Sequence, residues 1–387
     1  MNASVNAFIE QKRLKLNANK CGKIHIENKA SNNLCPDQKV HEEDMKISFN
    51  EKYLGDIVSN KCNSKDTIKD RKVRGNAILS EMRAILRDIP LGKWRTQIGF
   101  TLRKAWFLNG SLFNSEVWSG YTDNDLEDLE VIDHSIIRLI VGAQAKVPVE
   151  MLYLETAELP IKSVISVRRL AYLHTILLRH NSELIKQIYT AMKDRPLKLD
   201  WITLVKKDMA EINMDLTDEQ SSSFSYTDYK KLIKNKVKNK VFKELTDIKA
   251  SHSKVMNITH VNMDFPQNYL LSNQFSNKMC SLLFNLRSKS VNEFKGNMQS
   301  SNQQPPCTVC GQEEDSQEHS LICSVLKKHI PISHMELFES VKYADLFGNI
   351  VDQLQITEVF NTIIQTRQQL RKDSGASLPG QYSGPQD

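Results

Sequence analysis

The chain has 387 residues, enough for two or three domains with buried cores, and 40% of them are hydrophobic against 25% charged. No apolar run approaches the ~18 residues of a spanning helix, so the composition excludes a membrane protein. The net charge of +6 combines two basic blocks, 61–121 and 226–256, with an acidic block, 122–160. The chain starts without the apolar segment of a signal peptide, so we expect an intracellular location, nuclear or cytoplasmic.

Short alternating patterns predict strands in the first 60 residues. Residues 14–17 and 23–26 flank a turn-like Asn/Gly segment and weakly indicate a hairpin. Residues 45–49 alternate as well. Residues 53–58 are apolar around Gly55, which predicts one strand with a bulge or a close backbone approach at the glycine.

From residue 64 the apolar spacing becomes helical, and we expect the stripes to face a core. The four clearest stripes are Ile78/Met82/Ile85/Leu86/Ile89, Trp94/Ile98/Leu102/Ala105/Leu112, Leu126/Leu129/Ile132/Ile136/Ile140 and Ile161/Val164/Ile165/Leu170/Leu173/Leu177. The third helix begins with Thr122-x-x-Asp125, a capping-box-like start. We expect Trp94, Trp106 and Trp118 to be core residues rather than stacking surfaces.

Further helices are predicted over 183–193, 202–213, 226–249 and 268–295. A linker is expected at 296–306, and the Gly/Ser/Pro/Gln-rich end, 373–387, is expected to be disordered. The predicted fold class is therefore mainly α, with a small α+β part at the N-terminus.

The sharpest motif is Cys307-x2-Cys310-x8-His319-x3-Cys323. Three thiolates and one imidazole suit tetrahedral Zn²⁺, and an odd total of seven cysteines argues against a disulfide framework. Gly311 fits a tight turn with positive φ. His329 and His334 are alternative ligands at poorer spacing, and the other interpretation is three free cysteines near a surface histidine.

A lysine-rich segment precedes this motif. Its lysines are interleaved with aromatic residues, and they could bind a phosphate backbone or simply form a solvated helix. The candidate contacts are Lys230, Lys231, Lys234, Lys236, Lys238, Lys240 and Lys243. The loop between the Cys pairs is instead acidic, so the zinc module could be structural rather than a phosphate contact.

The order of these features resembles the C-terminal half of non-LTR (LINE-like) retrotransposon reverse transcriptases of the restriction-like-endonuclease group. Three segments carry the resemblance besides the Cys motif. They are Lys12-Arg13-Leu14-Lys15-Leu16-Asn17 with Lys20-Cys21 and Ile24; Lys52-Tyr53-Leu54-Gly55-Asp56-Ile57; and the helical part with Asn114-Ser115-Glu116-Val117-Trp118 and Glu158-Leu159-Pro160-Ile161. The match covers most of 5–330.

The resemblance implies RNA and DNA, as template and primer, as partners. Residues Tyr53, Leu54 and Gly55 would lie next to the primer. A family thumb lies along the template–primer duplex, so the basic residues of the thumb-like helices become candidate contacts. They are Arg71, Lys72, Arg74, Lys93, Arg95, Arg103 and Lys104.

The resemblance also implies an order of domains. It runs as a palm remnant (1–60), a thumb-like domain (61–180), a helical basic region (181–295), the linker, a zinc knuckle (307–330), a short helical region (331–372) and the tail.

The sequence departs from the family where catalysis is concerned. Family polymerases hold two Mg²⁺ ions on palm aspartates, and no Phe/Tyr-x-Asp-Asp sequence is present; Tyr343-Ala344-Asp345-Leu346 lacks the second Asp. Pro36-Asp37 and Asp44-Met45-Lys46 lie too close together for the endonuclease motif. We therefore expect a truncated reverse transcriptase with no catalytic residue, and Mg²⁺ only in a full-length parent. The alternatives are a non-catalytic nucleic-acid-binding zinc-knuckle protein and an inactive retrotransposon relic.

Overall fold

The computed structural model describes residues 11–12, 22–24, 39–40, 43–44, 46–214, 223–249, 264–294 and 305–373. The chain divides into two compact units, which each collect three separate stretches of sequence. Unit 1 comprises 1–76, 108–130 and 161–237, and unit 2 comprises 77–107, 131–160 and 238–387. The units interleave along the chain.

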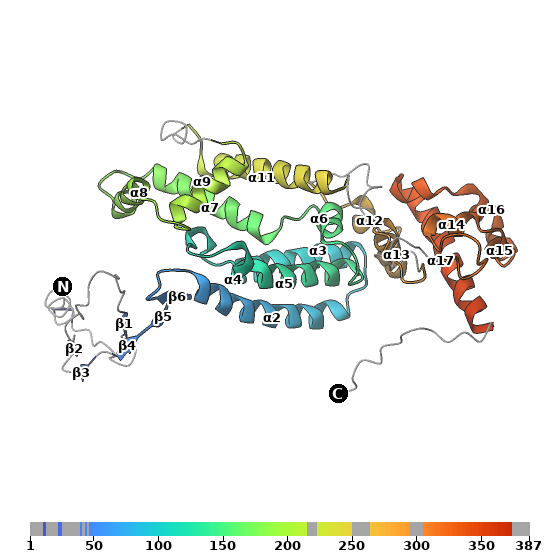
Figure 1. The fold of residues 1–387 in the computed structure, drawn as a ribbon, viewed down its shortest axis with the longest axis horizontal. Helices are drawn as coiled ribbons and strands as arrows, with labels where there is room; N and C mark the ends of the chain where they lie inside the picture. The colour runs from blue at the N-terminus through green and yellow to red at the C-terminus, as the bar shows by residue number, and fades with distance from the viewer. Residues whose placement is uncertain are drawn as a thin grey trace. The chain divides into compact units, whose positions relative to one another are not determined.

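The strands of unit 1 form three two-stranded pairs (Figure 1). The pairs are β1 (Gly22–Ile24) parallel to β4 (Lys46–Ser48), β2 (Lys39–Val40) antiparallel to β3 (Glu43–Asp44), and β5 (Asn50–Tyr53) antiparallel to β6 (Asp56–Ser59). Part of the expected strand at 45–49 is therefore present as β4. Residues 14–17 of the expected hairpin lie outside the described residues, and Lys23 and Ile24 pair with β4 instead.

The single bulged strand expected over 53–58 is wrong. The chain reverses at Leu54 and Gly55, whose φ angles are 48° and 92°, and β5 and β6 form a hairpin around them. Two successive residues with positive φ match the right-handed twist of a two-residue hairpin turn. The position of Leu54 is unusual, because asparagine, aspartate or glycine normally takes this conformation.

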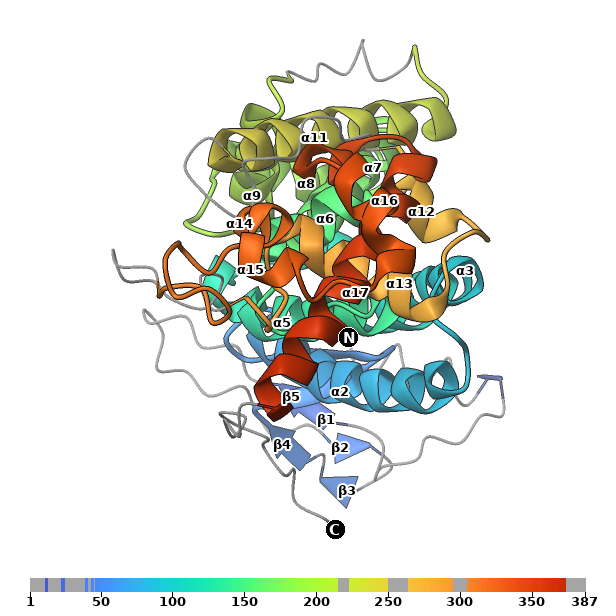
Figure 2. The same cartoon turned by 90° about the vertical axis from the view of Figure 1, so that its right-hand side faces the viewer.

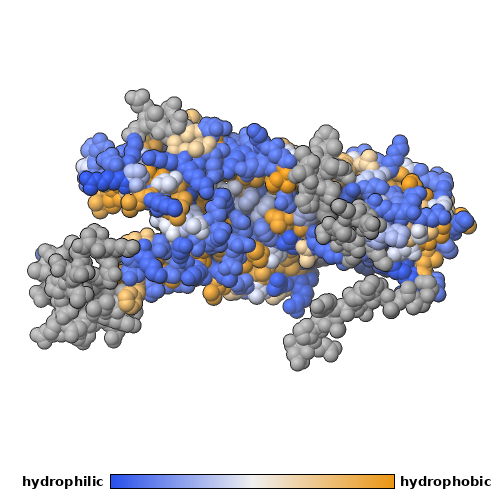
Figure 3. All heavy atoms as spheres, viewed as in Figure 1, coloured by the Kyte–Doolittle hydropathy of each residue, from blue (hydrophilic) through white to orange (hydrophobic). Residues whose placement is uncertain are grey.

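In unit 1, α7 (Ile161–Leu177) is buried on most of its circumference and contacts η3, α8 and α9. The bounds are α4 (Asn109–Ser111), η3 (Ser115–Val117), α7 (Ile161–Leu177), α8 (Leu184–Asp194) and α9 (Trp201–Glu211), together with the first parts of α2 (Lys65–Arg87), α5 (Asp123–Val141) and α11 (Tyr226–Lys249). α8 has an exposed apolar side formed by Leu184 and Ile188, and Figure 3 shows orange atoms over this helix.

Local capping explains where two of these helices begin. The Asp125 carboxylate accepts hydrogen bonds from the backbone N–H and the hydroxyl of Thr122, at 2.7 and 2.8 Å, which confirms the expected capping interaction at the start of α5. Asp200 caps α9 by accepting from the N–H of Thr203 at 2.7 Å. The apolar stripe expected on α5 is buried throughout, from Leu126 to Ile140.

Unit 2 has its core around α17, which packs against α13 and α16 (Figure 2). Its helices are α3 (Lys93–Leu102), the π-helix η2 (Arg103–Leu108), α6 (Val149–Thr156), α12 (Asn268–Leu271), α13 (Asn277–Arg287), α14 (Gln317–Ile322), α15 (Ser324–Lys327), α16 (Ile332–Ser340), η5 (Tyr343–Phe347) and α17 (Ile350–Asp373), together with the remaining parts of α2, α5 and α11. The helix expected over 268–295 is thus two helices, α12 and α13. Most of the expected linker and of the expected tail lies outside the described residues.

Buried arginines are held by carboxylates inside unit 2. Arg103 donates to both oxygens of Asp133, at 2.6 and 2.7 Å, and to Glu158 at 2.5 Å. Arg287 pairs with Glu155 at 2.9 Å, and neither side chain is accessible to solvent by more than 3%. Each buried charge therefore has an opposite charge and directional hydrogen bonds, which offsets its desolvation cost.

The core face of α3 is the opposite of the expected one. Trp94, Ile98 and Trp106 are exposed, with 65%, 38% and 38% of their surfaces accessible, whereas Thr96 and Gly99 are buried. A Cβ at Gly99 would lie 2.6 Å from Cγ1 of Ile140, so α3 approaches α5 through this glycine. Of the three expected core tryptophans, only Trp118 is buried. Among the described residues, no helix is both long and apolar enough to span a bilayer.

Candidate metal centre and nucleic-acid interface

The four expected metal ligands come together in unit 2. The ligand atoms of Cys307, Cys310, His319 and Cys323 all lie within 4.8 Å of one another, and Sγ of Cys310 is 3.3 Å from Nε2 of His319. A tetrahedral zinc ion with Zn–S bonds of about 2.3 Å separates its ligand atoms by roughly 3.5–3.8 Å. The donor set and its spacing therefore fit Zn²⁺. His329 and His334 are exposed and are not part of the cluster.

Two local structures position these ligands. The first pair lies on a tight turn, in which the N–H of Gly311 donates to the carbonyl of Cys307 at 2.8 Å and Gly311 has the expected positive φ of 69°. His319 lies on α14, where Ser316 caps the helix by accepting from the N–H of His319. Cys323 follows the last residue of α14 directly, in an extended conformation, and its Sγ still reaches the cluster.

Glu313 orients the histidine ligand. Its carboxylate lies 2.7 Å from Nδ1 of His319. Because a carboxylate can only accept, it holds the ring proton on Nδ1 and leaves Nε2, which faces Cys310, free to bind a metal. The acidic residue is thus an outer-shell partner of the site, which the sequence pattern did not predict.

The thiols start from different protonation states. Backbone N–H groups of Gln312 and Glu313 stabilise the thiolate of Cys310 and lower its pKa to about 6. Burial raises the pKa of the Cys323 thiol to about 11. Zinc binds thiolates, so Cys310 is a preformed ligand at neutral pH, whereas metal binding at Cys323 must release a proton.

The acidic loop of the motif also ties the centre to α17. Arg367 is 1% exposed and donates to Asp315 and, at 2.8 Å, to the hydroxyl of Thr308. Its guanidinium lies 5.0 Å from the ring centroid of Phe294. Glu318 pairs with Lys289 at 2.8 Å. Asp315 and Glu318 therefore have structural partners, and the Cys motif packs against other segments of unit 2.

The lysine-rich segment forms α11, and a narrow buried stripe holds this helix. The stripe repeats every fourth residue as Tyr229, Ile233, Val237, Val241 and Leu245. The seven candidate lysines occupy other positions of the helix, and no acidic residue lies between Lys230 and Lys243. Lys238 and Lys240 form ion pairs with Asp264 and Glu244. Figure 3 shows a mainly hydrophilic surface over α11.

The candidate contacts of the thumb-like helices fall into different environments. Arg71 and Arg103 are each 1% exposed and bind carboxylates, so their guanidinium groups are not available to phosphates. Lys72 pairs with Asp128 at 2.8 Å, and Arg95 donates to two backbone carbonyls. Only Arg74 and Lys104 are exposed, and Lys93 is half-buried with its ammonium 5.7 Å from the Trp94 ring.

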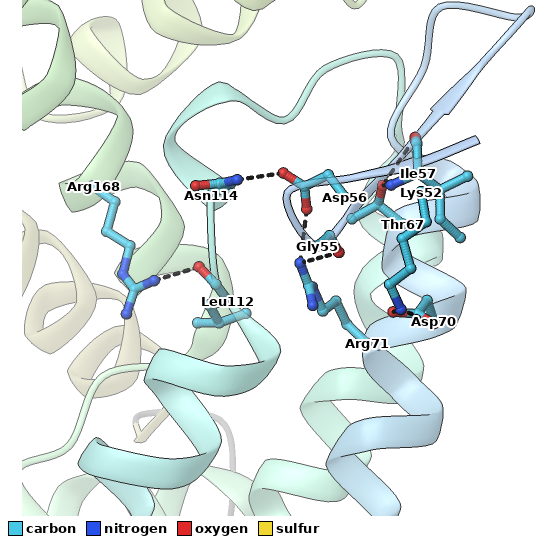
Figure 4. Close-up of polar contacts among 10 residues, drawn as sticks. All are labelled: Lys52, Gly55, Asp56, Ile57, Thr67, Asp70, Arg71, Leu112, Asn114 and Arg168. Carbon is cyan, nitrogen blue, oxygen red and sulfur yellow. Dashed lines mark hydrogen bonds and ion pairs between the residues drawn. The ribbon is translucent and has the colours of Figure 1, made fainter. Parts of the chain in front are cut away.

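The Tyr53-Leu54-Gly55 motif forms the tip of the β5–β6 hairpin, and Figure 4 shows how its base is fixed. Arg71 donates to the carbonyl of Gly55 and to the carboxylate of Asp56, both at 2.8 Å. Asn114 donates to the other carboxylate oxygen of Asp56 at 2.6 Å.

This anchored turn leaves its apolar tip in solvent. Tyr53 is 68% exposed and Leu54 is 74% exposed. Arg71 and Asn114, together called the clamp, therefore hold a rigid turn that presents two apolar side chains to solvent. Arg71, a candidate phosphate contact in the sequence, acts here as part of the clamp.

Comparisons with protein-family models, curated proteins and solved structures found no match to this chain. The chemistry of the two sites is therefore the basis of the functional argument. Within the described residues, the Cys–His cluster is the only group of three or more metal-ligating side chains.

Proposed function

We propose that this chain binds nucleic acid as the template- and primer-holding part of a reverse transcriptase of the non-LTR retrotransposon type. The observation that carries the proposal is α11, which combines a buried stripe with seven lysines and no acidic residue from Lys230 to Lys243. The buried stripe holds the helix in place, so its lysines form a fixed cationic surface. Lysines that neutralise phosphates release the counterions of the nucleic acid, which favours binding.

The zinc centre has a structural role in this proposal. A bound Zn²⁺ would cross-link the turn at Cys307 and Cys310 to α14, and would supply folding free energy to unit 2. Its surroundings are acidic and are already engaged with Arg367 and Lys289, which argues against direct phosphate contact.

The alternative function is nucleic-acid binding without any polymerase context, which the lysine surface of α11 supports equally well. Both functions predict binding without catalysis by this chain, but only the first predicts a preference for an RNA–DNA hybrid over single strands or duplex DNA.

Fluorescence anisotropy with labelled RNA–DNA hybrid, single-stranded RNA and duplex DNA tests the proposal. We expect saturable, salt-dependent binding that is tightest for the hybrid, and no primer extension with Mg²⁺. A variant with Lys230, Lys231, Lys234 and Lys243 changed to Gln should bind weakly. A control with four exposed lysines changed elsewhere, Lys61, Lys193, Lys198 and Lys328, should retain binding. Absence of binding at low salt would reject both functions.

A further inference from the structure

The exposed face of α3 and η2 carries large apolar side chains where a solvated helix would carry polar ones. Trp94, Ile98 and Trp106 are 65%, 38% and 38% exposed. Neither tryptophan has a partner for its indole N–H among the described residues. Figure 2 shows α3 alongside α12, which it contacts.

The orientation of this face is fixed by the opposite side of the helix. Gly99 allows contact with Ile140, and Arg103 is locked between Asp133 and Glu158. Arg95 donates to the carbonyl of Leu139 at 2.8 Å. Rotating the helix to bury the tryptophans would break these contacts, so the indoles are held in solvent by the core of unit 2.

The π-helix aligns the two indoles. In a regular α-helix, the face of Trp94 continues through residues 98, 101 and 105. A π-turn contains more residues than an α-turn, so it shifts the following side chains back by about one position. Trp106 thereby moves toward the place that residue 105 would have taken. Single π-turns within helices are frequent at functional sites.

The segment that carries this face contains basic but no acidic residues. No acidic residue occurs from residue 89 to residue 115. Lys93 lies beside Trp94, at 5.7 Å from its ring, and Lys104 is exposed two positions before Trp106. Aromatic rings can stack on bases, and lysines can neutralise phosphates, so this combination suits a nucleic acid. A protein partner would give no reason for the segment to lack acidic residues.

We infer that the face formed by Trp94, Ile98 and Trp106 is a stacking platform for the unpaired bases of a single-stranded nucleic acid, with Lys93 and Lys104 near its phosphates. The inference rests on the proposed nucleic-acid binding and adds a second contact surface to it. Trp94 and Trp106 are twelve positions apart, or about 18 Å along the helix at about 1.5 Å per residue. At roughly 3.4 Å per nucleotide, the platform accommodates about five nucleotides.

Titration of the full chain with oligothymidylates of three to twelve nucleotides tests this inference, with tryptophan fluorescence and anisotropy as readouts. The other two tryptophans, Trp118 and Trp201, are buried, so quenching reports mainly on the platform. Binding should strengthen up to about five nucleotides. Each Trp→Ala change at 94 or 106 should weaken binding by about 5-fold to 100-fold and leave the salt slope unchanged, because no charge is removed.

The matched control is Ile332→Ala, which removes a 93% exposed apolar side chain elsewhere in unit 2 and should have no effect. Lys104→Gln should reduce the salt slope by about 0.7. Unchanged affinity and persistent quenching in W94A/W106A, with binding still lost in the α11 lysine variant, would overturn the platform alone. If the wild-type chain self-associates, and W94A/W106A loses self-association but keeps its affinity for oligonucleotides, the platform is also overturned. If the wild-type chain binds an RNA–DNA hybrid but no oligothymidylate, the platform alone is overturned, and if it binds neither, both proposals are overturned.

Discussion

Removal of one partner of the buried pair Arg103–Asp133 should destabilise unit 2 strongly. Burial opposes the charge of Arg103, but the carboxylate of Asp133 raises the pKa of this arginine above its ordinary value, so the guanidinium stays charged in the fold. Arg103→Met leaves the fully buried carboxylate of Asp133 without its counter-charge, which costs about 3–5 kcal/mol. Asp133→Ala should cost less, because Glu158 still accepts from Arg103 at 2.5 Å.

The double variant Arg103→Met/Asp133→Leu removes both charges and restores apolar packing. Replacing a buried pair in this way is often neutral or stabilising, so the double variant should be more stable than either single variant, with a coupling energy of at least about 2 kcal/mol. Urea denaturation followed by far-UV circular dichroism measures these differences. A loss below about 1 kcal/mol in R103M, together with weaker nucleic-acid binding, would refute the structural role of Arg103.

Three further perturbations follow from the same structure. Glu313→Gln should weaken zinc binding by about 10-fold to 100-fold in chelator competition while His319 remains a ligand, since it alters the partner that fixes the imidazole tautomer; equal affinity would contradict this. Gly99→Ala should destabilise unit 2 by about 1–2 kcal/mol despite the better helix propensity of alanine, because the new Cβ meets Ile140 at 2.6 Å; a more stable variant would contradict the close packing. Asp200→Ala should cost about 1 kcal/mol at neutral pH. Although partial burial raises the pKa of Asp200, backbone N–H groups lower it overall, so this contribution is present above the unfolded-state pKa and is lost as the pH falls through the folded-state pKa; a cost independent of pH would contradict the cap.

Sequence patterns predicted the structure correctly where the pattern within one segment determines it. The apolar stripe from Leu126 to Ile140 follows the helical period and is buried as expected. The four metal ligands were predictable because their spacing alone brings each pair onto one turn. The outer partners of the site were not, because Arg367 lies 52 positions from Asp315 and an acidic loop looks the same whether it is solvated or paired.

The choice of core face on α3 could not be read from the helix itself. The apolar stripe through Trp94 and Ile98 is the stronger local pattern, but the helix buries Gly99 and Arg103 instead. The reason lies in the partners Ile140 and Asp133, which come from another segment of the chain. The turn at Leu54 was hidden for a similar reason, because leucine gives no local signal for positive φ.

The salt dependence of binding to an RNA–DNA hybrid tests the central claim most directly. If α11 is the phosphate-binding surface, changing Lys230, Lys231, Lys234 and Lys243 to Gln should reduce the slope of log K against log salt by about 3 to 4, and the four control lysines should leave it unchanged. A slope and affinity that are the same in the α11 variant and the wild-type chain would contradict the proposed function.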